Sequence, residues 1–201
     1  MQSATPENLI LLCGELTNGG EKIHPLDGAN TREFTIKVVL PSGTDILPIL
    51  IPEALIDETL TIGATVSVTG KLISEEQTEN GETRTLLKIA VQELYAGETE
   101  VTSGLFLTGN VIKKPHSYPL PNGERTEFSL AVGQADGEVA YVFVAAEGEL
   151  AGAAKNLSLG DSVSLLGQLH SYEYLSLDGT SADSYTAYEV VALTFISLPK
   201  I

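Results

Sequence analysis

The chain has 201 residues, which is more than the usual length of one domain and suits two domains of about 100 residues each. Apolar residues make up 43% of it, so we expect a folded chain, and no stretch is long and apolar enough to span a membrane. The net charge of −16 argues against nonspecific binding of duplex DNA, because Lys and Arg provide most of that affinity.

The N-terminal stretch MQSATPEN has neither the basic start nor the apolar run of a secretory signal, so we expect a cytoplasmic protein. The one cysteine, Cys13, lies in the apolar run NLILLCGEL, where we expect a small buried side chain. The charge is uneven between the halves. Residues 1–100 hold 6 Lys and Arg against 16 Asp and Glu, and residues 101–201 hold 5 against 11, so the halves carry −10 and −6.

Four motifs occur in the same order in both halves, which indicates an internal repeat. Gly14 corresponds to Gly109 at a spacing of 95, and Phe34 corresponds to Phe128 at a spacing of 94. The paired segments are LCGEL with LTGNV, REFTIKV with TEFSLAV, IGATVSVTGKL with LGDSVSLLGQL, and LKIAVQELY with YEVVALTFI.

The repeated motifs read as strands, because apolar and polar residues alternate in them with a period of two. Phe34, Ile36 and Val38, for example, alternate with polar neighbours. One helix is predicted between the third and fourth strands of each copy, over residues 51–63 and 148–160. This order is typical of the oligonucleotide/oligosaccharide-binding (OB) barrel, although pattern alone also allows a five-stranded sandwich.

We therefore predict an all-β protein with two tandem OB barrels, each with one short helix between strands 3 and 4. Polar, small residues from Ala96 to Gly104 indicate the boundary, so the domains are predicted at residues 1–98 and 103–201. Turns between strands are predicted at residues 80–81, 122–123 and 178–179.

The second copy resembles the bacterial single-stranded DNA-binding protein family over residues 104–198. The resemblance rests on Pro121-Asn122-Gly123, on Gly148-Glu149-Leu150-Ala151 and on Leu159-Gly160-Asp161, which match the family's turn, helix start and fourth strand. The first copy resembles the family more faintly. The resemblance implies single-stranded DNA as the ligand and a homo-oligomer with a four-barrel arrangement.

The same resemblance implies roles for three tyrosines. Tyr118 matches an aromatic residue of the first loop, Tyr141 a stacking tryptophan of the third strand, and Tyr174 a stacking residue of the hairpin between strands 4 and 5. The chain departs from the family where Glu147 replaces a stacking phenylalanine, and it contains no tryptophan.

Alternation independently predicts an aromatic face on the second copy. Tyr141 and Phe143 should lie opposite Val142 and Val144, which we assign to the core. In GQLHSYEY, the same rule places three rings on one face: His170, Tyr172 and Tyr174. These rings can stack on unpaired bases, or they can form an interface between barrels or chains, where tyrosine is also favoured.

A small basic cluster precedes Tyr118. Lys113, Lys114 and His116 are close together, and Arg125 follows after a short loop. These groups can neutralise phosphates, or they can simply be solvated. In the first copy, Glu75, Glu76 and Glu79 occupy the region that holds Tyr172 and Tyr174 in the second, so we expect that barrel to be structural or to bind protein.

We find no catalytic or metal-binding motif. The three histidines lack zinc-ligand spacing, and no serine-nucleophile motif is present, so we expect no enzyme, no metal and no cofactor. The favoured hypothesis is a single-stranded DNA-binding module acting in replication, recombination or repair, with replication or repair proteins as further partners. The alternative is an OB protein that binds other proteins or is structural and has lost nucleic-acid binding.

Overall fold

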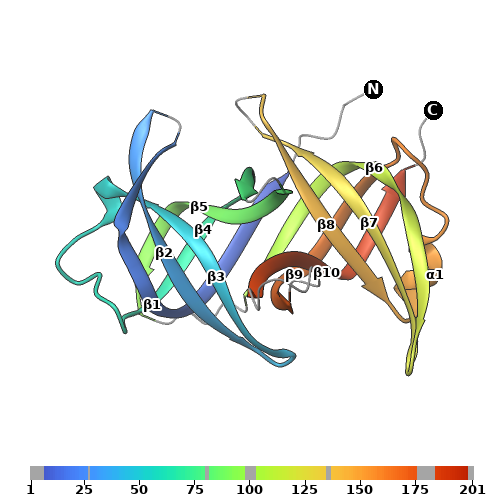
Figure 1. Cartoon of the computed structure of the whole chain (residues 1–201), viewed down its shortest axis with the longest axis horizontal. Helices are drawn as coiled ribbons and strands as arrows, with labels where there is room; N and C mark the ends of the chain where they lie inside the picture. The colour runs from blue at the N-terminus through green and yellow to red at the C-terminus, as the bar shows by residue number, and fades with distance from the viewer. Residues whose placement is uncertain are drawn as a thin grey trace.

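The computed structural model describes residues 7–26, 28–79, 82–97, 103–134, 137–175 and 184–198. Strands dominate it, and two barrels lie side by side (Figure 1). The strands of the first barrel are β1 (Asn8–Leu26), β2 (Ala29–Leu40), β3 (Gly43–Pro52), β4 (Thr65–Glu79) and β5 (Glu82–Ala96). Those of the second are β6 (Gly104–Leu120), β7 (Gly123–Gly133), β8 (Val139–Glu147), β9 (Ser162–Leu175) and β10 (Ser184–Leu198).

Each set of five strands closes into a barrel with the same topology. In the first barrel the order is β1-β2-β3-β5-β4, and β4 pairs again with β1. In the second the order is β6-β7-β8-β10-β9, and β9 pairs again with β6. The β3–β5 and β8–β10 pairs are parallel, and all the other pairs are antiparallel. This is the predicted all-β fold of two OB barrels.

Apolar residues that alternate along the strands fill both barrels. In β8, Val142 and Val144 are each 1% exposed, whereas Tyr141 and Phe143 face outward, as alternation predicted. In β2, Phe34 and Ile36 point into the core of the first barrel. Cys13 is half-buried rather than fully buried.

The repeated glycines mark places where two strands come too close for a side chain. A Cβ on Gly14 would lie 2.2 Å from the carbonyl oxygen of Lys37, and one on Gly109 would lie 2.7 Å from that of Ala131. Real Cβ atoms do not approach a backbone oxygen so closely, so these positions require glycine. Gly70 and Gly167 repeat the arrangement against a carbonyl of the fifth strand.

The helix between strands 3 and 4 differs between the barrels. In the second barrel it is α1 (Glu149–Ala154), where the sequence ELAGAA has strong helix formers. In the first, the predicted helix is reduced to a single 3-10 turn, η1 (Glu53–Leu55). The chain turns there instead, because the Asp57 carboxylate accepts a 2.8 Å hydrogen bond from the Thr59 amide, and β-branched residues follow.

The two barrels join through antiparallel pairing of β1 with β6. Ile10 pairs with Leu105, which is its own counterpart in the repeat, so the junction has an approximate two-fold symmetry. Two hydrogen bonds repeat this symmetry: the Ile46 amide donates to Ser171 Oγ at 3.2 Å, and the Tyr141 amide donates to Ser74 Oγ at 3.0 Å. The barrels are therefore held together by strand pairing and by hydrogen bonds from backbone amides to serine side chains.

Some predictions concern residues outside the described ranges. The domain boundary at residues 99–102 and the predicted turns at 80–81 and 178–179 belong to this group. The predicted turn at 122–123 is confirmed, because Pro121 and Asn122 connect β6 with β7. Within the described residues, no helix is both long and apolar enough to cross a membrane.

Candidate nucleic-acid interface

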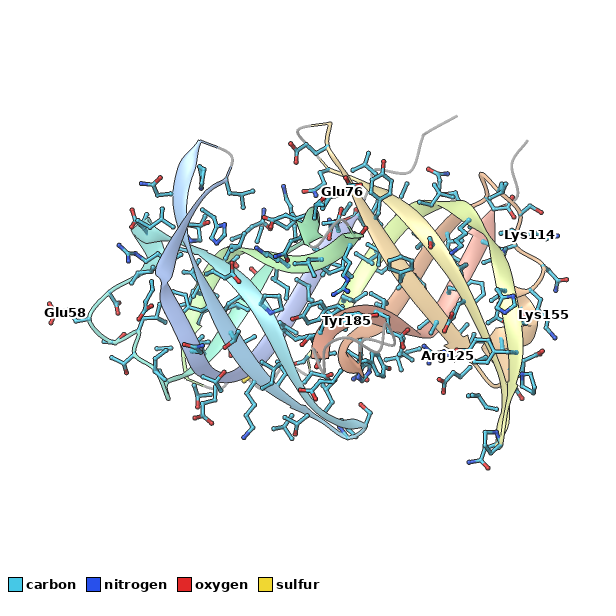
Figure 2. All side chains as sticks on the ribbon, viewed as in Figure 1. Glu58, Glu76, Lys114, Arg125, Lys155 and Tyr185 are labelled. Atoms are coloured by element: carbon cyan, nitrogen blue, oxygen red, sulfur yellow. The ribbon has the colours of Figure 1, made fainter. Side chains whose placement is uncertain are left out.

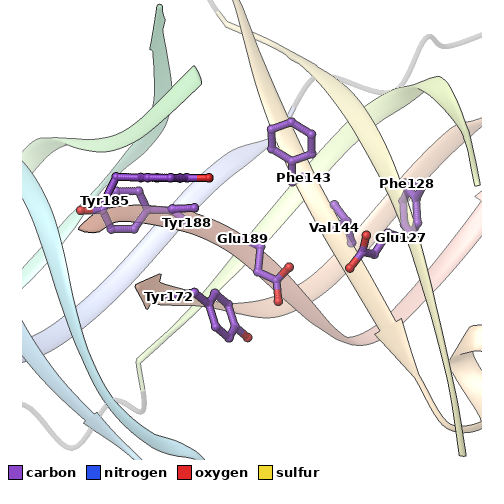
Figure 3. A pocket seen from close by; sticks show the side chains of 9 residues that line it. Glu127, Phe128, Phe143, Val144, Tyr172, Tyr185, Tyr188 and Glu189 are labelled. Atoms are coloured by element: carbon purple, nitrogen blue, oxygen red, sulfur yellow. The ribbon is translucent and has the colours of Figure 1, made fainter. Parts of the chain in front are cut away.

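A pocket of about 240 Å³ opens on the outer face of the second barrel, over β7, β8, β9 and β10 (Figure 3). Alternation along these strands turns Phe143 and Tyr172 outward, whereas Phe128 and Val144 belong to the buried core. The aromatic lining residues are Phe128, Phe143, Tyr172, Tyr185 and Tyr188, and the others are Glu127, Val144, Ala187 and Glu189.

The rings of this pocket are accessible from outside. Phe143 on β8 is 46% exposed, and Tyr172 on β9 is 37% exposed. Tyr141, two residues before Phe143, is 48% exposed but does not line the pocket. The structure therefore leaves the predicted aromatic face open at Tyr141, Phe143 and Tyr172.

Two tyrosines of the pocket, Tyr185 and Tyr188 on β10, were not predicted as site residues. Tyr185 is the backbone partner of Tyr174, and Ala187 is the partner of Tyr172. A signal was available, because Tyr185, Ala187 and Glu189 alternate along a strand that follows the predicted aromatic strand β9. Period-two reading of β10 would have placed them on one face.

The first barrel contributes a cation to this face. The Arg84 guanidinium on β5 lies 3.9 Å from the centre of the Tyr185 ring, a cation–π arrangement. Figure 2 shows Tyr185 close to the junction of the two barrels. The pocket thus lies next to the first barrel, which the sequence predicted to be structural or to bind protein.

An ionic cluster lies beneath the pocket, centred on Arg125 of β7. The guanidinium donates to Glu127 at 3.0 Å, to Glu147 at 2.8 Å and also to Glu189. Burial opposes the charge of Arg125, but the hydrogen bonds and charges of these carboxylates outweigh it and raise the pKa. The Arg125 side chain is only 13% exposed, so its guanidinium interacts with these carboxylates rather than with solvent.

Two tyrosines extend this cluster. The Tyr118 hydroxyl donates to Glu127 Oε1 at 2.5 Å, and burial followed by this hydrogen bond raises the pKa of Tyr118. Burial, and then the hydrogen bond and charge of Glu189, raise the pKa of Tyr172. Both hydroxyls therefore stay protonated at neutral pH and can act as hydrogen-bond donors.

No known family model and no curated protein sequence matches the chain. Among solved structures, the wild-type single-stranded DNA binding protein from Thermus aquaticus superposes with a TM-score of 0.73 and 19% identity, covering 98% of this chain and 95% of that one. A deletion mutant of that protein gives the same TM-score and identity, covering 99% and 98%. The chain has the fold of a tandem-barrel single-stranded DNA-binding protein. The resemblance predicted from the second copy is thus confirmed as a likeness of fold, and it extends over both copies.

The small single-stranded DNA-binding protein from Streptomyces coelicolor also matches, at 27% identity and a TM-score of 0.39, over 46% of this chain and 90% of that one.

The predicted basic cluster does not gather around the pocket. Lys113 and Lys114 are exposed on β6, and in Figure 2 Lys114 lies on the side of the second barrel away from Tyr185. The His116 ring is exposed and lies 6.1 Å from the Tyr118 ring. Arg125 differs from the two lysines, because its guanidinium already forms ion pairs with Glu127 and Glu147.

His170 lies in the junction between the barrels. Its Nδ1 is 3.1 Å from Asp45 Oδ2 of β3, and the His170 side chain is 13% exposed. The neighbouring Ser171 amide donates to Asp45 Oδ1 at 2.7 Å. His170 therefore lies at the interface between the barrels, which was one of the two predicted roles of these rings. Tyr172, two residues later, lines the pocket instead. The backbone of Tyr174 is in β9, and its side chain lies outside the described part of the structure.

Across the described residues, no group of three or more His, Cys, Asp or Glu side chains is arranged to hold a metal ion.

Proposed function

We propose that this protein binds single-stranded DNA through the aromatic pocket of its second barrel. The observation that carries the proposal is the grouping of Phe143, Tyr172 and Tyr185 around one open pocket on the outer face of a closed barrel. These rings come from three neighbouring strands, so a rigid sheet holds them in place.

Ring stacking suits a ligand of arbitrary sequence, because every base has a π face. Each stacked base contributes about 1–3 kcal/mol by alanine substitution. Tyr141 extends the same face of β8 and provides a further ring near the junction. Tyr174 is also proposed to stack, from its position in the β9–β10 hairpin.

Phosphates would find few cations on this surface. Arg84 lies beside the pocket, and Lys113 and Lys114 are exposed at a distance from it. Arg125 and His170 are already paired with carboxylates, so we assign them structural parts in the site rather than phosphate contacts. The affinity should therefore be modest, because few cations face the phosphates and the net charge is −16. It should fall only gradually as salt rises, because few counterions are released on binding.

The test is anisotropy of a fluorescein-labelled single-stranded oligonucleotide of mixed sequence at low salt. Phe143→Ala and Tyr172→Ala should each weaken binding by about tenfold, which corresponds to about 1.4 kcal/mol of lost stacking. Tyr95→Ala is the matched control, because Tyr95 is 53% exposed on β5 of the first barrel and does not line the pocket. Absence of binding by the wild type, or equal affinity in all three variants, would overturn the proposal.

In the cell, we place this activity in replication, recombination or repair in the cytoplasm, in a homo-oligomer that meets other proteins of those pathways. The fold supports this placement, since the similar structures are single-stranded DNA-binding proteins. A monomer at every protein concentration in light scattering would contradict the proposed homo-oligomer.

A second candidate is an OB protein that binds a basic protein. It is favoured by one observation, the carboxylates Glu127 and Glu189 in the pocket wall. Recovery of a stable protein partner that oligo-dT does not displace, together with no oligonucleotide binding, would support this candidate over the first.

A further inference from the structure

The two sides of the pocket differ in chemistry. In Figure 3, Tyr185 and Tyr188 lie on one side and the Glu127 carboxylate on the other, with the Glu189 carboxylate between Phe143 and Tyr172. The tyrosine side is next to the positive Arg84 guanidinium. The opposite side presents hydrogen-bond acceptors that carry negative charge.

The acceptor side keeps negative charge despite Arg125. Three carboxylates, of Glu127, Glu147 and Glu189, share this one guanidinium, so the cluster retains a net charge of about −2. Both bonds to Glu127, from Tyr118 and from Arg125, end on Oε1. A carboxylate has about four acceptor sites, so these bonds use part of its capacity. The Glu127 side chain is 44% exposed and accessible to a ligand.

Bases differ in what their edges would offer to these acceptors. Guanine presents a ring N–H beside an amino group, which are two adjacent donors that match a carboxylate. Cytosine and adenine present an amino group beside an acceptor nitrogen. Thymine presents one N–H between two carbonyl oxygens, which the carboxylates would repel.

We propose that the pocket selects a base with an amino donor edge, guanine before cytosine and adenine, and disfavours thymine. The inference rests on the proposed binding of single-stranded DNA and adds its base preference. In the bound state the base stacks on the rings with its edge toward Glu127 and Glu189. The phosphate lies toward Arg84, where the positive charge matches it.

The experiment compares short oligonucleotides of thymidine that carry one central guanine, cytosine, adenine or hypoxanthine. Anisotropy competition with the wild-type chain should show at least about fivefold tighter binding with guanine than with thymine, the lower end of discrimination by a bidentate pair. Hypoxanthine lacks the amino group of guanine and should lose part of this gain.

Two variants connect the preference to the pocket. Glu127→Gln should reduce the guanine preference, because an amide replaces a charged acceptor with a mixed donor and acceptor. Glu147→Gln is the matched control: Glu147 also binds Arg125, its side chain is 48% exposed, and it does not line the pocket. It removes the same charge from the cluster but leaves the acceptors of the pocket wall in place, so it should keep most of the preference.

The outcomes separate this inference from the proposed function. Equal affinity for all the oligonucleotides, or a preference for thymine, overturns the base selectivity and leaves single-stranded DNA binding in place. An equal loss of preference in Glu127→Gln and Glu147→Gln overturns the assignment to the pocket wall. If no oligonucleotide binds, the proposed function fails, and the inference fails with it.

Discussion

The two barrels place different chemistry on the same framework. Four equivalent positions lie on the first, second, fourth and fifth strands of each barrel, and in the first barrel they form a closed ionic cluster. Lys88, whose side chain is 8% exposed, lies 2.8 Å from Glu75 and 3.2 Å from Glu33. Glu33 is also 2.8 Å from His24. The counterparts of His24, Glu33, Glu75 and Lys88 in the second barrel are Tyr118, Glu127, Tyr172 and Glu189.

The second barrel thus replaces two charged or titratable groups with phenol rings and reverses the sign of a third. The cation of the second cluster is Arg125 on β7. The equivalent position of the first barrel holds Thr31. In the first barrel Lys88 pairs with two carboxylates, those of Glu33 and Glu75, and none of the four positions holds a phenol ring. The second keeps excess negative charge and opens an aromatic pocket. Few substitutions on a shared fold therefore separate a closed ionic cluster from an open aromatic pocket.

The largest expected effect comes from removing the central cation of the second barrel. Arg125→Ala leaves three carboxylates facing one another and should lower the free energy of unfolding by about 3 kcal/mol, since one partner of a buried ion pair is lost. Arg32→Ala in the first barrel should cost less, about 1 kcal/mol, because the side chains of the Arg32–Glu53 pair are each 37% exposed. Urea unfolding measures both. Equal costs would show that Arg125 is not the centre of a buried cluster.

Exchange between equivalent positions should transfer binding behaviour. Tyr172→Glu copies Glu75 into the second barrel and should weaken oligo-dT binding by about tenfold or more, because a stacking ring becomes a charge that repels phosphate. Glu75→Tyr should strengthen binding by a few-fold at most, since the first barrel lacks the other rings of the pocket. Anisotropy checks both variants, and a stronger gain from Glu75→Tyr than the loss from Tyr172→Glu would contradict the division between the barrels.

The smallest expected effects are on the pH dependence of the free energy of unfolding, which should differ between the two clusters. Burial raises the pKa of Glu127, but hydrogen bonds from Tyr118 and Arg125 outweigh it, so the folded-state pKa lies below the ordinary 4.5. Its contribution to stability is therefore present above 4.5 and is lost as the pH falls through the lowered pKa. The difference in unfolding free energy between wild type and Glu127→Gln should shrink in acid.

Lys88 should behave in the opposite sense. Burial lowers its pKa, but Glu75 and Glu33 outweigh this and raise it above 10.5, so its contribution is present below 10.5 and is lost at higher pH. The difference between wild type and Lys88→Met should shrink in alkali. Urea unfolding over a pH series checks both differences, and a shared pH trend for the two variants would argue against separate clusters.

Local sequence pattern was enough to predict the strands and the two barrels. The alternation of Tyr141 and Phe143 with buried valines follows from the geometry of a single strand. The structure confirms it, with both rings exposed and both valines buried. The repeated glycines were found as sequence anchors, and the structure explains them as close backbone approaches at Gly14 and Gly109. The reduced helix η1 was missed because Pro52 signals a helix start, whereas the Asp57 turn determined what followed.

The candidate site depended on contacts that no local pattern reveals. Arg125 and Glu189 meet although they lie 64 residues apart, because β8 pairs with β10 in parallel. Ser171 and Asp45 meet across the junction at a separation of 126 residues. The predicted phosphate contact by Arg125 and base contact by His170 assumed free side chains, and both turned out to have partners from other strands. The assignment of Tyr118, Tyr141, Phe143, Tyr172 and Tyr174 to base stacking stays a prediction.

Tyrosine fluorescence during titration with oligo-dT at low salt tests the central claim most directly, because the chain has seven tyrosines and no tryptophan. We predict that emission falls on binding and that Tyr95→Phe leaves the size of this fall unchanged. The double variant Tyr172→Phe with Tyr185→Phe should still bind but should lose most of the quenching, since phenylalanine keeps the stack without the emission. Unchanged emission of the wild type at saturation, or quenching that disappears with Tyr95→Phe, would contradict binding at the aromatic pocket.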